Sequence, residues 1–224
     1  MRRSFRLAWL VLALCACSSG PPPPDWQLNA KSAMDRAVAT YLAGDTRASA
    51  AESDRARVEI ARTGRIDLLA RAELMLCAAR VASLEFETCE GFEKLRVDAA
   101  APERAYADYL AGQVQSETIA LLPPAQRGVA AKGASDESSA VSVKDIDDPL
   151  SRLVAAGVLM QAGRVTPAVV TLAVETASAQ GWRRPLLAWL GVQRMRAEKA
   201  GDSTAAERLR RRIEIIEQTG QQTK

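Results

Sequence analysis

The residues best suited to chemistry in this 224-residue chain are two groups of carboxylates. The first group lies in a polar segment and consists of Asp136, Glu137, Asp145, Asp147 and Asp148. The second surrounds Cys89 and consists of Glu85, Glu87, Glu90 and Glu93. Paired acids hydrolyse glycosides only when they converge across a cleft, and a calcium-binding EF-hand loop needs acids at alternating positions with a distal Glu. The spacing shows neither arrangement, so both groups are interpreted as solvated surface, and a glycan hydrolase is the least favoured alternative.

The chain contains no histidine, which removes the commonest general base and the commonest zinc ligand. It also lacks a glycine-rich phosphate loop, a Gly-x-Ser-x-Gly motif and an HExxH motif. Two cysteines outside the N-terminal segment are too few for a cysteine zinc site. We therefore expect no catalytic residues, no cofactor and no metal.

Those two cysteines, Cys77 and Cys89, are candidates for a disulfide. Cys77 lies in a helical pattern, and Cys89 follows the expected end of that helix at Leu84. A chain reversal near residues 85–88 could bring the two Cα atoms within the roughly 4.4–6.8 Å that a disulfide requires. An oxidising compartment favours the bond, whereas the alternative is that Cys77 is a small core residue.

Residues 1–20 have the parts of an export signal. Arg2, Arg3 and Arg6 form a basic start, and residues 7–16 form an apolar run that ends beside small residues. The run is shorter than the roughly 20 apolar residues that cross a bilayer. Four prolines at 21–24 then stop any helix. This pattern predicts a signal peptide over residues 1–16.

The end of this segment, Leu14-Cys15-Ala16-Cys17, resembles the lipobox of bacterial lipoproteins. The resemblance implies cleavage between Ala16 and Cys17 and acylation of Cys17, which would hold the protein on a lipid bilayer. Cys15 stands where the family usually has Ala, Ser or Thr, and the alternative acceptor, Cys15 itself, would place the bulky Leu14 before the cleaved bond. Ser18 instead of Asp after the acylated cysteine implies the outer membrane, facing the periplasm, rather than the inner membrane.

Composition and glycine spacing predict an all-α body without a sheet. Ala and Leu dominate an apolar fraction of 48% and favour helices. Six glycines follow apolar-periodic runs, as is typical of helix C-termini, and they are Gly44, Gly64, Gly163, Gly181, Gly201 and Gly220. The first two are 20 residues apart, and the last four are 18, 20 and 19 residues apart. The run 74–79 is apolar on all sides and predicts an enclosed helix. Thr204 and Glu207 have capping-box spacing at the start of the last helix.

A polar segment at residues 125–148 interrupts this spacing, and we expect a flexible loop there. The expected organisation begins with a lipidated cysteine and Pro-rich tether at residues 17–26. Two helical halves, at residues 27–124 and 149–220, are separated by the loop, and a polar tail follows at residues 221–224. The spacing of Ala156, Leu159, Gly163, Ala168 and Leu172 resembles the packing positions of tetratricopeptide-type arrays. The glycine intervals of 38 and 39 residues exceed the usual length of about 34. The resemblance therefore implies stacked antiparallel hairpins, an α-solenoid, without identifying groove residues.

Charge excludes one class of partner. Removing the three leader arginines lowers Lys+Arg from 30 to 27, which equals the Asp+Glu count of 27. A neutral body with 4% aromatic residues offers little to a polyanion, so nucleic acid is excluded as a partner. Candidate partner-surface residues are Tyr106, Tyr109, Arg208, Arg211 and Arg212. The alternatives are packing for the tyrosines and a solvated, ion-paired helix face for the arginines.

These observations favour a membrane-anchored lipoprotein that acts as a helical-repeat adaptor for an envelope protein. The alternative function is that of a carrier that binds a small or hydrophobic molecule instead of a protein. Its pocket would lie between the two halves, lined by Leu153, Leu187 and Trp189.

Overall fold

The computed structural model describes residues 22–131 and 136–221, with side chains placed at 22–131 and 140–218. Within these ranges the chain forms eleven α-helices, one 3-10 helix and no strand, which confirms the all-α prediction. The elements are α1 (Asp25–Ala43), α2 (Thr46–Ala61), α3 (Ile66–Ala82), α4 (Glu90–Glu93), α5 (Ala101–Leu110), η1 (Ser116–Leu121), α6 (Pro124–Ala131), α7 (Asp136–Lys144), α8 (Pro149–Gln161), α9 (Pro167–Ala179), α10 (Arg183–Lys199) and α11 (Ser203–Gln221). The expected signal peptide, Ala16 and Cys17 lie outside the described residues.

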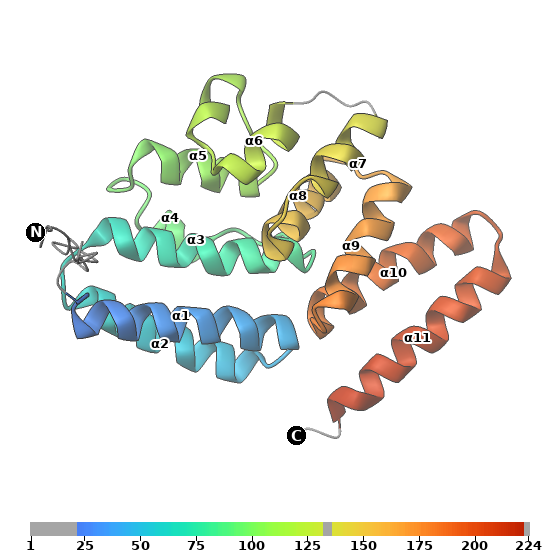
Figure 1. Ribbon diagram of the computed structural model, residues 1–224, viewed down its shortest axis with the longest axis horizontal. Helices are drawn as coiled ribbons and strands as arrows, with labels where there is room; N and C mark the ends of the chain where they lie inside the picture. Colours follow the sequence, from blue (N-terminus) through green and yellow to red (C-terminus); the bar gives the residue numbers. More distant parts are fainter. Residues whose placement is uncertain (1–21, 132–135, 222–224) are drawn as a thin grey trace, which may run out of the picture.

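The helices form an array of packed neighbours (Figure 1). Helices α1 and α2 form an antiparallel hairpin, and α3 packs on both of them. The next partner of α3 is α8, which is followed by α9, α10 and α11 in chain order. The segment from α4 to η1 and α6 lies beside α3, on the side away from α1 (Figure 1). This arrangement is consistent with a helical repeat, and the tetratricopeptide-like assignment stays a prediction.

Glycine ends the helices largely as predicted. Backbone φ is positive at five of the six glycines, namely Gly44, Gly64, Gly163, Gly181 and Gly201. A positive φ is unstrained for glycine and turns the chain out of the helix. Gly220 differs because it lies inside α11. The N-cap of α11 also differs from the expected Thr204, because the Asp202 carboxylate accepts a hydrogen bond from the Ala205 amide at 2.9 Å.

The prediction of a flexible loop at residues 125–148 is corrected by the structure, because this segment contains most of α6 and all of α7. The segment is polar on average, but a few of its side chains are deeply buried, among them Gln126, Val129, Val143 and Ile146. These side chains pack into the core and hold short helices that local propensity alone would not maintain. The first helix also begins at Asp25, two residues before the expected boundary, and its acidic first turn complements the helix dipole.

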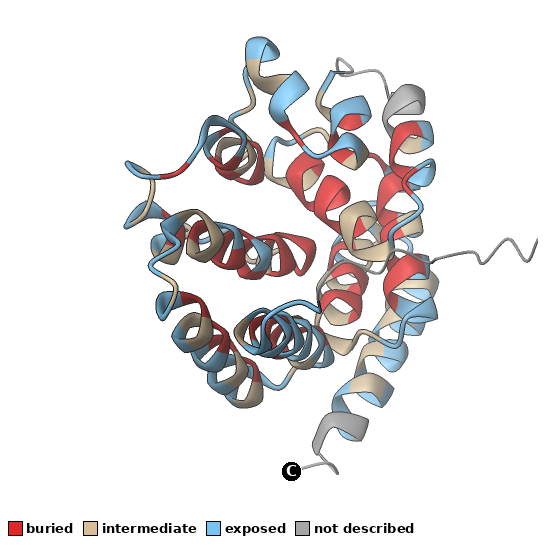
Figure 2. Ribbon diagram, turned by 60° about the vertical axis from the view of Figure 1, so that its left-hand side comes forward, coloured by how far each residue is buried: buried red, intermediate tan, exposed pale blue. Residues whose placement is uncertain are grey.

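Two apolar clusters meet at α3. One cluster is formed by α1, α2 and α3, and the other extends from α3 through α5 and α8 to α10. Buried positions accordingly lie on the sides of the helices that face one another (Figure 2). Trp189 of α10 is fully buried and its indole Nε1 donates to the Ala82 carbonyl at 3.1 Å, which joins α10 to the end of α3. Helix α3 is therefore the central support of the body.

Candidate binding groove on helix α3

Two adjoining hollows open along one side of α3. Their volumes are about 430 and 530 Å³, and Arg71 and Met75 line both of them. Leu68, Arg71 and Met75 recur at steps of three and four residues, which places them on one face of the helix. We call this surface the α3 groove and define it by Trp26, Met34, Leu68, Arg71, Met75, Pro102, Tyr106 and Leu121.

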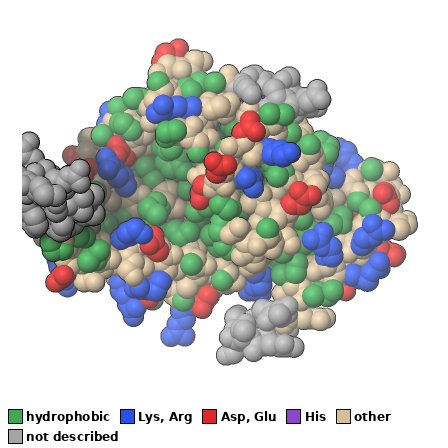
Figure 3. Space-filling model, viewed as in Figure 1, with side chains coloured by type: hydrophobic (Ala, Val, Ile, Leu, Met, Phe, Trp, Pro, Cys, Tyr) green, Lys and Arg blue, Asp and Glu red, His purple; other side chains and the backbone are tan. Residues whose placement is uncertain are grey.

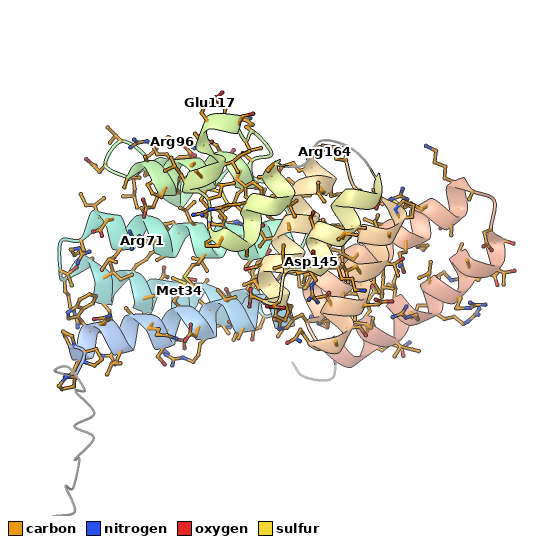
Figure 4. The ribbon with its side chains drawn as sticks, turned by 45° about the horizontal axis from the view of Figure 1, so that its top comes forward. Met34, Arg71, Arg96, Glu117, Asp145 and Arg164 are labelled. Carbon is orange, nitrogen blue, oxygen red and sulfur yellow. A yellow bond between two sulfur atoms is a disulfide. The ribbon has the colours of Figure 1, made fainter. Side chains whose placement is uncertain are left out.

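Different elements supply the two walls of the α3 groove. Helix α1 supplies Trp26 and Met34, and the opposite wall comes from α5, which carries Tyr106, and from η1, which carries Leu121. Figure 4 shows Met34 and Arg71 on the neighbouring helices α1 and α3. Apolar side chains gather in a recess over this half of the molecule (Figure 3). The groove thus depends on three layers of helices that the core holds in place.

Met75 is the most informative residue of the groove. It belongs to the apolar run 74–79, which was expected to be enclosed, and the other five members of that run are buried. Met75 instead is 44% exposed at the floor of both hollows. A methionine side chain is flexible and polarisable, so it adapts to varied apolar ligands. An exposed apolar side chain between buried members of the same run indicates a binding surface.

An ion pair lies within the groove. Arg71 Nε donates to Glu103 Oε1 at 2.6 Å, and the Glu103 side chain is only 7% exposed. Glu103 Oε2 is buried and has no hydrogen-bond partner among the described residues. The remaining nitrogens of Arg71 lie on a side chain that is 59% exposed. The groove therefore combines an apolar surface with one exposed guanidinium and one free buried acceptor.

The opposite side of α3 is polar. A hollow of about 550 Å³ is lined there by Arg57, Glu73, Arg80 and residues of the α4 region. Arg57 holds both oxygens of the buried Glu73 carboxylate, at 2.6 and 3.0 Å. A Cβ at Gly91 would overlap that carboxylate, so glycine permits the close approach of α4. We assign a structural role to this buried, doubly bonded pair.

Cys77 and Cys89 meet beside this polar hollow. Their Cα atoms are 5.7 Å apart and the pair lies at disulfide distance, as predicted. The linkage joins α3 to the residue that precedes α4. Its position next to Gly91 and Glu73 indicates that it holds the α4 corner against α3.

The acidic groups do not assemble into one site. Glu87 and Glu90 line the polar hollow, whereas Glu85 pairs with Arg184 at 3.0 Å and Glu93 with Arg96 at 2.7 Å. In the other group, Asp148 caps α8 by accepting from the Ser151 amide at 2.7 Å. Side chains of Asp136 and Glu137 lie outside the described residues. Within the described part of the chain, no group of three or more His, Cys, Asp or Glu residues is arranged to hold a metal ion.

Tyr109 was a candidate partner-surface residue, and the structure corrects this prediction. Its side chain is fully buried, and its hydroxyl donates to Gln126 Oε1 at 2.7 Å. Gln126 Nε2 in turn donates to the Ser151 carbonyl at 3.0 Å, so this chain of hydrogen bonds joins α5 and α6 to α8. Tyr109 is a packing residue because its polar atom is satisfied inside the core. Tyr106 is partly buried and lines the groove wall.

The arginine group lies elsewhere. Arg208, Arg211 and Arg212 are exposed on α11, at the other end of the array from the α3 groove (Figure 1). Arg211 lies 3.9 Å from Glu207, and the neighbouring Arg210 lies 3.2 Å from Glu214. Tyrosines and arginines therefore do not form one surface.

The residues expected to line a carrier pocket belong mainly to the core. Leu153 and Trp189 are fully buried, and Leu187 is half-buried. The hollows along α3 are lined by other residues.

None of the described helices is long and apolar enough to cross a bilayer. No protein-family model, curated protein or solved structure matches the chain.

Proposed function

We propose that this protein is a lipid-anchored adaptor that faces the periplasm from the outer membrane and binds an apolar segment of an envelope protein in the α3 groove. One observation carries the proposal, namely an open apolar groove built by three helical layers around the exposed Met75. Apolar grooves between helices commonly receive an amphipathic helix that inserts side chains at three- and four-residue steps. The two hollows have the volumes typical of ligand sites.

The expected tether supports a partner close to the membrane. Trp26, at one end of the groove, follows the acylation candidate Cys17 by nine residues. A fully extended chain spans at most about 3.3–3.6 Å per residue, so Trp26 would stay within about 30 Å of an acylated Cys17. Tethering at this range raises the effective concentration of the groove toward proteins of the same membrane.

The proposed partner segment is largely apolar. Leu68, Met75 and Leu121 offer it apolar contact area, and burying that area supplies most of the affinity. Arg71 provides one charged contact at the same surface.

Photocrosslinking in cells tests the proposal. A benzophenone amino acid is placed at Met75 or, as a matched control, at Val58, which is a 53% exposed apolar residue of α2 that lines neither groove hollow. We expect one envelope protein to crosslink at Met75 and not at Val58. Equal crosslinking at both positions, or none at either, would contradict the proposal. A small molecule captured at Met75 in place of a protein would favour the carrier.

A further inference from the structure

A separate hollow opens at the C-terminal part of α10. Its volume is about 530 Å³, and its lining includes Met160, Val165, Val192, Met195, Arg196 and Lys199. Val192 is buried at its base, whereas Met195 is 54% exposed. Met160 comes from α8, so the hollow lies between two non-consecutive helices of the array. Two adaptable methionines at an exposed apolar recess favour protein binding.

The charge of this hollow has one sign. Both charged residues in its lining, Arg196 and Lys199, are cations and both are exposed. Neither forms an ion pair with any described residue, although other arginines nearby do. The adjacent carboxylate of Glu198 lies 3.7 Å from Arg194 instead. Helix α10 therefore presents an apolar recess with two uncompensated positive charges beside it.

We propose that this hollow is a second docking site, for a short acidic amphipathic segment of a protein partner. Apolar side chains of that segment pack between Met160 and Met195, and its carboxylates pair with Arg196 and Lys199. Charge complementarity selects an acidic partner over a basic one and fixes its orientation in the recess. The site is independent of the α3 groove.

The charges and their position favour a protein over a membrane surface. Juxtamembrane segments that bind anionic lipids usually present clusters of about four to eight basic residues, whereas this hollow has two. It also lies at the opposite end of the long axis of the molecule from the start of α1 (Figure 1). A bilayer close to the start of α1 would thus lie away from this hollow.

Fluorescence anisotropy with the purified full-length protein tests the site. The probe is a labelled amphipathic peptide of leucine and glutamate, about five helical turns long. We expect the double variant Arg196→Glu with Lys199→Glu to weaken its binding at least ~10-fold, which is about 1.4 kcal/mol. The matched control, Arg208→Glu with Arg212→Glu, makes the same change in net charge on the exposed face of α11 and is expected to change binding less than ~2-fold.

Three results would overturn the site. The first is no binding of the leucine-glutamate peptide, or equal binding of a leucine-lysine peptide. The second is an equal loss in both double variants, which would show that only net charge matters. The third is binding of anionic phosphatidylglycerol vesicles that the Arg196 and Lys199 changes abolish, because the surface would then recognise lipid. Val58→Glu, an apolar-to-acidic change at an exposed position that lines neither this hollow nor the α3 groove, should leave peptide binding unchanged.

Discussion

Gly157 allows α8 to pass α3 at close range. A Cβ at this position would overlap the backbone carbonyl of Val81, which cannot move aside as the end of a flexible side chain can. We expect Gly157→Ala to lower the free energy of unfolding by about 2 kcal/mol or more, as overpacked cores do. Urea unfolding, followed by circular dichroism, measures the change.

Gly191 is the matched control, because it is also helical and a Cβ there would meet nothing within 4 Å. Gly191→Ala should raise the free energy of unfolding by about 0.5–1 kcal/mol through helix propensity. Similar effects of the two substitutions would contradict the close packing of α8 on α3.

The tyrosines predict how stability changes in alkaline solution. Burial raises the pKa of Tyr41, Tyr106 and Tyr109, the three tyrosines of the chain, well above the ordinary value of about 10. Because their pKa is higher in the folded state, this stabilisation is complete below about pH 10. It is lost as the pH rises further, since the unfolded chain ionises first.

We therefore expect tyrosinate absorbance to stay low in the folded protein above pH 10 and to appear together with unfolding. The same titration in denaturant should give a midpoint of about 10. A native-state titration near that value, with circular dichroism unchanged, would contradict the burial of these hydroxyls.

The Cys77–Cys89 linkage gives a prediction for the corner between α3 and α4. It closes a loop with a sequence separation of 12 residues, for which restriction of the unfolded chain predicts about 3 kcal/mol of stabilisation. Replacing both cysteines by alanine should lower the free energy of unfolding by about this amount. A reducing agent should lower the stability of the wild-type protein and leave the variant unchanged. If it affects both equally or neither, the linkage does not stabilise the corner.

Helix ends were predictable where a glycine follows an apolar run. Gly44 and Gly163 show why, because a residue with positive φ ends a helix through local chemistry alone. Helix α3 was expected to end at Leu84 and ends at Ala82, and Leu84 has a φ of 61° although it is not a glycine. Helices α6 and α7 were missed because contacts distant in sequence stabilise them, such as the hydrogen bond from Gln126 to Ser151.

The α3 groove could not be derived from the sequence for a similar reason. The periodicity of the sequence identifies apolar positions, but it does not show which of them no other helix covers. Met75 and Leu76 are adjacent members of one apolar run, yet Met75 is exposed and Leu76 is buried. Tyr106 and Tyr109 likewise share a helix, and only their tertiary surroundings separate a groove residue from a core residue.

Arg184 links the two ends of the array into one body. From the start of α10 its Nε donates to the Tyr41 carbonyl at 2.8 Å, and its Nη1 pairs with Glu85 at 3.0 Å. Its guanidinium also lies 4.3 Å from the centre of the Tyr41 ring. These contacts hold α10 against the C-terminal end of α1, so the α3 groove and the α10 hollow belong to the same folded unit.

We propose that acyl chains on Cys17 hold this helical body, and with it the α3 groove, at the membrane. Labelled palmitate fed to growing cells tests it most directly. We predict that the protein takes up the label and fractionates with the outer membrane. Cys17→Ser should abolish uptake, whereas the matched variant Cys15→Ser should retain it. Loss in Cys15→Ser alone would move the lipid to Cys15, and an unlabelled wild-type protein in the soluble fraction would contradict the tethered adaptor altogether.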